Sequence, residues 1–123
     1  MNNAIYLLYV EDNEGDVELL KMSIERHCPT HNIILEVAET VEEAKELFQF
    51  NKHRTALLDW NLPDGEGIEV AEFIRSSHDD FPIFFLSGVF TDTHLGVAEK
   101  YKPIACLEKD YNKGFIEQIL FFL

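Results

Sequence analysis

TALLDWNLPDG, at residues 55–65, is a short apolar run that ends at a carboxylate, Asp59, and continues into turn residues. Three other stretches follow the same plan, because the apolar runs AIYLLYV, IFFL and IACLE end just before Glu11, Ser87 and Lys109. If these runs are neighbouring parallel strands, their polar ends lie at the same edge of one sheet. Open α/β sheets bind ligands at that edge. We therefore expect the four polar ends to meet at one site.

Apolar runs alternate with amphipathic segments five times along the chain, which is typical of βαβ repetition and a parallel sheet. The expected strands are 5–10, 33–38, 55–58, 83–86 and 104–107. The expected helices are 16–28, a segment opened by a capping box of Thr40 and Glu43, 68–75, 91–101, and a last helix capped by Asn112. The predicted fold class is α/β, with five parallel strands flanked by five helices.

Length and composition indicate one globular domain, 1–123, since 123 residues leave no room for a second. The net charge of -13 argues against nucleic-acid and anionic-membrane surfaces, which require Lys and Arg. No apolar run approaches the length of a membrane helix, and the amino terminus lacks a basic segment. Cys28 and Cys106 are predicted to be reduced thiols, which indicates a cytoplasmic protein.

The histidines show no metal-ligand spacing and are predicted to lie at the surface or in loops. They are His27, His31, His53, His78 and His94.

The polar strand ends have the chemistry of a divalent-cation site. Glu11, Asp12 and Asp59 would supply carboxylate oxygens to Mg²⁺ or Mn²⁺, and a backbone carbonyl just beyond Asp59 would complete the set. Without metal the three carboxylates repel each other, so at least one should have a raised pKa. Asp59 is the candidate nucleophile toward phosphorus, with Lys109 neutralising charge and Ser87 donating a hydrogen bond to a phosphoryl oxygen.

The chain resembles the response-regulator receiver domains of two-component signalling from residue 5 to about residue 119. The resemblance rests on YVED with Glu11 and Asp12, LLDWNLPDG with Asp59, the Ser-Gly pair at Ser87, and Lys109. It implies a flavodoxin-like, doubly wound sheet of strand order 2-1-3-4-5.

The resemblance also implies a function. A sensor histidine kinase or histidine phosphotransfer protein would donate a phosphoryl group to Asp59 with Mg²⁺ present, and the backbone carbonyl of Asn61 would be the further metal ligand. The domain would act as a signalling switch rather than a conventional turnover enzyme. We expect it to change partner binding through the face formed by the fourth helix, the fifth strand and the fifth helix, where Gly96 weakens the fourth helix.

Two positions depart from the family pattern. Cys106 stands three residues before Lys109, where the family usually carries an aromatic residue that moves together with the hydroxyl at Ser87. We interpret Cys106 as a small buried hydrophobe, with a thiol sensor as the alternative. Asp110 stands where the family commonly has a proline in a cis bond. We expect a trans bond there, because a cis bond before a residue other than proline costs about 2.5–4 kcal/mol.

Other functions remain open on the sequence alone. A receiver-like interaction module that is not phosphorylated is one alternative. An aspartate-nucleophile phosphatase of the haloacid-dehalogenase type is a weaker one, since those enzymes carry a second Asp where this chain has Asn61.

The last helix carries two adjacent apolar stripes. They are Phe115, Ile119 and Phe122, and Ile116, Leu120 and Leu123. We favour a broad core face here, with a partner or dimer surface as the alternative.

Overall fold

The computed structural model describes residues 3–123, which form one five-stranded sheet and a separate two-stranded hairpin. Every neighbouring pair of strands in the main sheet is parallel. In spatial order these strands are β2 (Ile33–Ala38), β1 (Ile5–Val10), β3 (His53–Asp59), β6 (Ile83–Ser87) and β7 (Ala105–Glu108). Counted without the hairpin strands, this is the order 2-1-3-4-5, so the predicted flavodoxin-like fold is confirmed.

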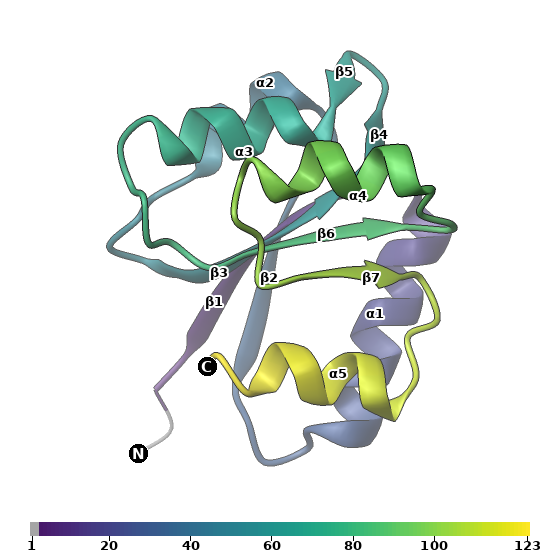
Figure 1. Cartoon of the computed structure of the whole chain (residues 1–123). Coiled ribbons are helices and arrows are strands. Elements are labelled where there is room, and N and C mark those ends of the chain that lie inside the picture. Colours follow the sequence, from purple (N-terminus) through teal and green to yellow (C-terminus); the bar gives the residue numbers. More distant parts are fainter. Residues whose placement is uncertain (1–2) are drawn as a thin grey trace.

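Helices cover both faces of the sheet (Figure 1). One face is covered by α2 (Val41–Leu47), α3 (Gly67–Arg75) and α4 (Asp92–Glu99), and the other by α1 (Glu14–His27) and α5 (Lys113–Leu120). In residues 3–123 no helix is both long enough and apolar enough to cross a membrane.

The two cores follow from the alternation of side chains along each strand. In β1, Leu8 and Val10 enter the core beneath α2, α3 and α4, whereas Leu7 and Tyr9 enter the core beneath α1 and α5. Because both faces are covered, the strand is apolar at nearly every position, as expected for a buried parallel sheet.

The hairpin is an element that the sequence reading missed. Its strands β4 (Asn61–Leu62) and β5 (Gly65–Glu66) pair antiparallel around the turn that Pro63 and Asp64 were expected to make. The Asp64 carboxylate accepts hydrogen bonds from the backbone N–H groups of Val41 and Glu42, at 2.8 and 3.2 Å. The loop after Asp59 is therefore tied to the start of α2.

The prediction that all histidines lie at the surface or in loops is wrong for His53. Strand β3 begins two residues earlier than expected, at His53, which is 3% exposed. Its Nδ1 accepts from the Gln49 N–H, so its Nε2 donates to Glu36, 2.6 Å away. Both ring nitrogens thus have partners, which makes burial of this polar side chain affordable.

The caps of the helices agree largely with the sequence. Asn112 caps α5 by accepting from the Phe115 N–H, and Thr40 caps α2 by accepting from the Glu43 N–H. The Glu43 carboxylate, however, bonds the N–H of Glu39 instead of Thr40, one residue before the expected capping-box partner.

Helix α5 uses its wide apolar face mainly for packing. Phe115, Ile116 and Ile119 are buried against the sheet and α1. The helix ends at Leu120, which leaves Phe121 84% exposed. The interpretation of a broad core face fits these buried residues, while Phe121 lies outside it.

Candidate phosphoacceptor site

Three carboxylates meet at the carboxyl ends of β1 and β3. Glu11 and Asp12 directly follow β1, Asp59 is the last residue of β3, and one oxygen from each lies within 4.8 Å of the others. The parallel register pairs Val10 with Leu58, which brings the two strand ends side by side. Glu11 and Asp59 are buried, whereas Asp12 is exposed.

Lys109 joins this cluster from the end of β7. Its backbone N–H donates to the Ser87 carbonyl at 2.8 Å, which aligns it with the end of β6. Its Nζ lies 2.7 Å from Glu11 Oε1, 3.1 Å from Asp59 Oδ1 and 3.3 Å from Asp16 Oδ2. The structure therefore brings Glu11, Asp12, Asp59 and Lys109 together, as the sequence predicted.

Asp16 was not among the predicted site residues. It lies in the first turn of α1, where an acidic residue is ordinary because it complements the helix dipole. Its carboxylate reaches Lys109 only because α1 packs next to α5 on the same face of the sheet. The one ammonium group is consequently shared among three carboxylates.

Burial and the neighbouring charges shift the pKa values of Glu11 and Lys109. Burial, followed by the neighbouring Asp59 carboxyl, raises the pKa of Glu11 to about 7, although the Lys109 ammonium acts in the opposite direction. This is the raised carboxylate pKa expected from the sequence. Burial by itself would lower the pKa of Lys109, but the hydrogen bond to Glu11 and the charges of Asp59 and Glu11 outweigh burial and raise it.

Ser87 lies at the edge of the site with its hydroxyl engaged elsewhere. The side chain is buried, and Oγ donates to the carbonyl of Val89 at 2.9 Å, in the loop before α4. A bond from Ser87 to a phosphoryl group on Asp59 would therefore require this contact to break. Asn61 is exposed in β4, two residues past Asp59, and the ligand role of its carbonyl stays a prediction.

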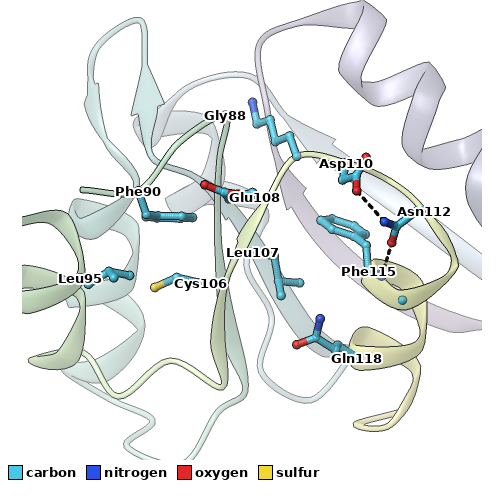
Figure 2. A pocket seen from close by; sticks show the side chains of 12 residues that line it. Gly88, Phe90, Leu95, Cys106, Leu107, Glu108, Asp110, Asn112, Phe115 and Gln118 are labelled. Carbon is cyan, nitrogen blue, oxygen red and sulfur yellow. Dashed lines mark hydrogen bonds between the residues drawn. The ribbon is translucent and has the colours of Figure 1, made fainter. Parts of the chain in front are cut away.

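A groove of about 850 Å³ lies between α4, β7 and α5. Figure 2 shows the Cys106 sulfur pointing toward α4 and Leu95, while Leu107 points to the opposite side of the strand. Burial raises the pKa of the Cys106 thiol, which keeps it protonated and unreactive. Cys106 is only partly buried, not fully buried as expected, and it packs against the core beneath α2, α3 and α4. This environment agrees better with a small hydrophobe than with the thiol-sensor alternative.

Asp110 does not compete for the ammonium of Lys109 in this structure. Its carboxylate accepts a hydrogen bond from the side-chain amide of Asn112, the cap of α5 (Figure 2). Among residues 3–123 no ion pair joins Asp110 to Lys109, and no peptide bond is cis. The expected trans bond after Lys109 is therefore present.

Gly67 supports the backbone of Asp59 and was also missed by the sequence reading. It is the first residue of α3, and its N–H donates to the Trp60 carbonyl at 3.0 Å. A Cβ atom at this position would lie 2.2 Å from the carbonyl oxygen of Asp59. Only glycine permits this approach, which the hairpin after Asp59 creates.

Comparisons with known proteins agree with the geometry. The model of the response regulator receiver domain matches residues 7–121. The chain is 33% identical over 82 residues to the photosynthetic apparatus regulatory protein RegA of Cereibacter sphaeroides, a match that covers 67% of this chain and 42% of RegA. It is 35% identical over 94 residues to the transcriptional regulatory protein SrrA of Staphylococcus aureus, covering 76% of this chain and 36% of SrrA. The chain therefore spans about two fifths of the length of these relatives.

Solved structures show the same fold. The non-phosphorylated HemR receiver domain from Leptospira biflexa superposes with a TM-score of 0.83 at 28% identity, covering 96% of this chain and 93% of that one. The Vibrio cholerae chemotaxis protein CheY4 superposes with a TM-score of 0.79 at 18% identity, covering 97% and 98%. The family model matches most of the chain, and the carboxylates and the lysine on which the resemblance in sequence rests lie together at one edge of the sheet. The chain belongs to the response regulator receiver domain family.

Proposed function

We propose that this chain, over its whole length 1–123, is a phosphoacceptor switch of two-component signalling in the cytoplasm. Asp59 would take a phosphoryl group from a sensor histidine kinase or a histidine phosphotransfer protein. One observation carries the proposal: the buried Asp59 carboxylate lies 3.1 Å from the Lys109 ammonium and within 4.8 Å of the Glu11 and Asp12 carboxylates. This geometry supports the proposal, because the candidate nucleophile, a cation and the candidate metal ligands lie close together.

The chemistry follows from these side chains. An Asp59 oxygen attacks phosphorus and forms the new P–O bond, while the P–N bond to the donor histidine breaks and its electron pair stays on the imidazole. Positioning and charge neutralisation dominate such transfers. Lys109 supplies a fixed positive charge beside the acceptor, and its raised pKa keeps it protonated.

The donor set fits a hard divalent cation such as Mg²⁺ or Mn²⁺. Three carboxylate oxygens from Glu11, Asp12 and Asp59 converge, and exposed Asp12 leaves the site open to hydrated ions. We propose the Asn61 carbonyl as the further ligand. Such a cation, when bound, neutralises charge on the transferring phosphoryl oxygens.

Output would run through the face made by α4, β7 and α5. The Ser87 hydroxyl now holds the loop before α4 through the Val89 carbonyl. Transfer of that hydroxyl to a phosphoryl oxygen would release this contact, and Cys106 lies in the adjoining groove beside α4. A changed position of α4 is how we propose that partner binding responds, with Ser87 and Cys106 as the switch positions.

Intact-protein mass spectrometry tests the proposal directly. Acetyl phosphate with Mg²⁺ should add the mass of one phosphoryl group to the wild-type protein, and EDTA should prevent the addition. Asp59→Asn should stay unmodified, whereas the control Asp80→Asn, at an exposed position outside the site, should be modified like wild type. Equal modification of Asp59→Asn, or no modification of the wild type, would contradict the proposed function.

A further inference from the structure

Two buried tyrosines lie beneath the acidic cluster, and the proposed chemistry does not use them. The Tyr9 side chain is completely buried in β1, and its hydroxyl lies 3.4 Å from Glu11 Oε1. On its other side the same hydroxyl lies 3.3 Å from the hydroxyl of Tyr111, which is 9% exposed. The two phenols therefore form a continuous path from Glu11 to the loop between β7 and α5.

The far end of this path is anchored in the fold. The Tyr111 carbonyl accepts a hydrogen bond from Ser23 of α1 at 2.6 Å. Its ring packs against Phe115 of α5, with centroids 5.2 Å apart. Tyr111 also has a φ of 55°, a left-handed conformation that is unfavourable for an aromatic residue. Several contacts together hold this residue in place, two positions after Lys109.

The single proton on each tyrosine hydroxyl determines which group donates and which accepts in the two hydrogen bonds. Each phenol carries one proton, and burial raises the pKa of both tyrosines, that of Tyr111 to about 12, so both stay protonated. When Glu11 is ionised it can only accept, so Tyr9 must donate to Glu11 and accept from Tyr111. Glu11 Oε2 receives a further hydrogen bond from the Asn13 N–H at 3.3 Å. The carboxylate is thus oriented through both oxygens.

We propose that Tyr9 and Tyr111 form a hydrogen-bond relay that orients the Glu11 carboxylate and fastens the Lys109 loop to the acidic site. The relay makes both tyrosines positioning residues, Tyr9 directly on Glu11 and Tyr111 through Tyr9. This inference rests on the proposed function, because it assigns residues that prepare the same metal and phosphoacceptor site.

Packing alone does not explain the two hydroxyl groups. Phenylalanine would fill the same core, and a buried hydroxyl without a partner costs free energy that a phenyl ring avoids. Both oxygen–oxygen distances are at the long end for O–H···O bonds, so each contact is modest. Because Tyr9 is shielded from water, however, its hydroxyl has no competing solvent partner.

Two measurements on Tyr9→Phe, Tyr111→Phe and the double variant test the relay. Tyr6→Phe is the matched control, since Tyr6 lies in the same strand but its ring faces the Lys52 ammonium at 4.7 Å, away from the site. The first measurement is the Mg²⁺ dissociation constant, followed by the fluorescence of Trp60, next to Asp59. The second is hydrogen exchange of the backbone amides of 109–111 in EDTA, which needs no metal.

The relay predicts a specific pattern. Tyr9→Phe should raise the Mg²⁺ dissociation constant about three- to ten-fold, the effect of losing one hydrogen bond of ordinary strength, as the long contact with Glu11 implies. Tyr111→Phe should raise it less, and the double variant should match Tyr9→Phe, because Tyr111 acts only through Tyr9. Exchange of the 109–111 amides should quicken in all three variants but not in Tyr6→Phe.

Results that contradict the relay can be told apart from results that contradict the proposed metal site. If the wild type binds Mg²⁺ and the variants match it, or if their effects add, the relay is wrong while the proposed function stands. If the wild type shows no Mg²⁺ response, the proposed metal site fails, and the exchange measurement alone decides the relay. Unchanged exchange at 109–111 in Tyr9→Phe would then reject it.

Discussion

Raising the pH of the metal-free protein should destabilise it through Glu11. In the folded protein the pKa of Glu11 is about 7, against an ordinary value of 4.5. Between these two pH values the folded state holds a proton that the unfolded state has released. The free energy of unfolding therefore falls as pH rises. The loss is absent below pH 4.5, where both states are protonated, and complete above about pH 7.

The size of this effect follows from the same two values. One pKa unit corresponds to about 1.4 kcal/mol, so a rise from 4.5 to about 7 corresponds to a loss of about 3 kcal/mol. A domain of this size is typically stable by only about 5–15 kcal/mol, which makes the loss readily measurable. Saturating Mg²⁺ should remove it, because a bound cation favours the ionised carboxylate.

Urea unfolding at pH 5 and pH 8 in EDTA measures the prediction. Wild type should lose about 2.5 kcal/mol more than Glu11→Gln over this interval, since glutamine cannot ionise and the unfolded state has already released most of its proton at pH 5. Glu25→Gln, exposed on α1, is the matched control and should behave like wild type. The comparison with Glu11→Gln cancels the contribution of the histidines. An equal pH dependence in wild type and Glu11→Gln would refute the reasoning.

Two glycines and one carboxylate give further predictions. Gly67→Ala should lower the free energy of unfolding in urea by about 1–3 kcal/mol, because its Cβ would lie 2.2 Å from the Asp59 carbonyl oxygen. An unchanged free energy of unfolding would show that α3 can shift freely. Gly96→Ala, with nothing within 4 Å in α4, should instead stabilise by about 0.5–1 kcal/mol in the same assay, and a loss of stability would contradict the open environment. Asp16→Asn should change stability by less than about 1 kcal/mol, yet speed modification of Asp59 by acetyl phosphate, because it frees Lys109 and removes a charge that repels the anionic donor. An unchanged rate in mass spectrometry would place Asp16 outside the reaction.

The parts of the site that lie at strand ends were predictable from the sequence. A parallel strand buried on both faces is a continuous apolar run, so its last residue can be read directly. Glu11, Asp59, Ser87 and Lys109 each close such a run. Helix caps were similarly readable at Asn112, because capping depends on residues three positions apart.

Features that depend on contact with another helix, strand or loop could not be predicted from the sequence. The hairpin at residues 61–66 is too short to show a period, and the burial of His53 depends on Glu36 from the neighbouring strand β2. The approach of Gly67 to Asp59 arises only when the chain turns back into α3. The sequence does not show which backbone atoms a glycine will lie against in the folded protein.

The amino-acid order by itself determined the α/β class, the parallel sheet and the edge at which the carboxylates and the lysine meet, because periodicity and strand ends are local properties of the chain. Tertiary structure alone decided that Asp16 shares Lys109, that Tyr9 reaches Tyr111, and that the Ser87 hydroxyl is held by Val89. These contacts depend on the docking of α1, on the left-handed turn at Tyr111 and on the loop before α4. The first two join segments distant in sequence, for which no local pattern exists. The Ser87 contact spans only two residues, but it depends on the conformation that the loop before α4 adopts in the folded protein.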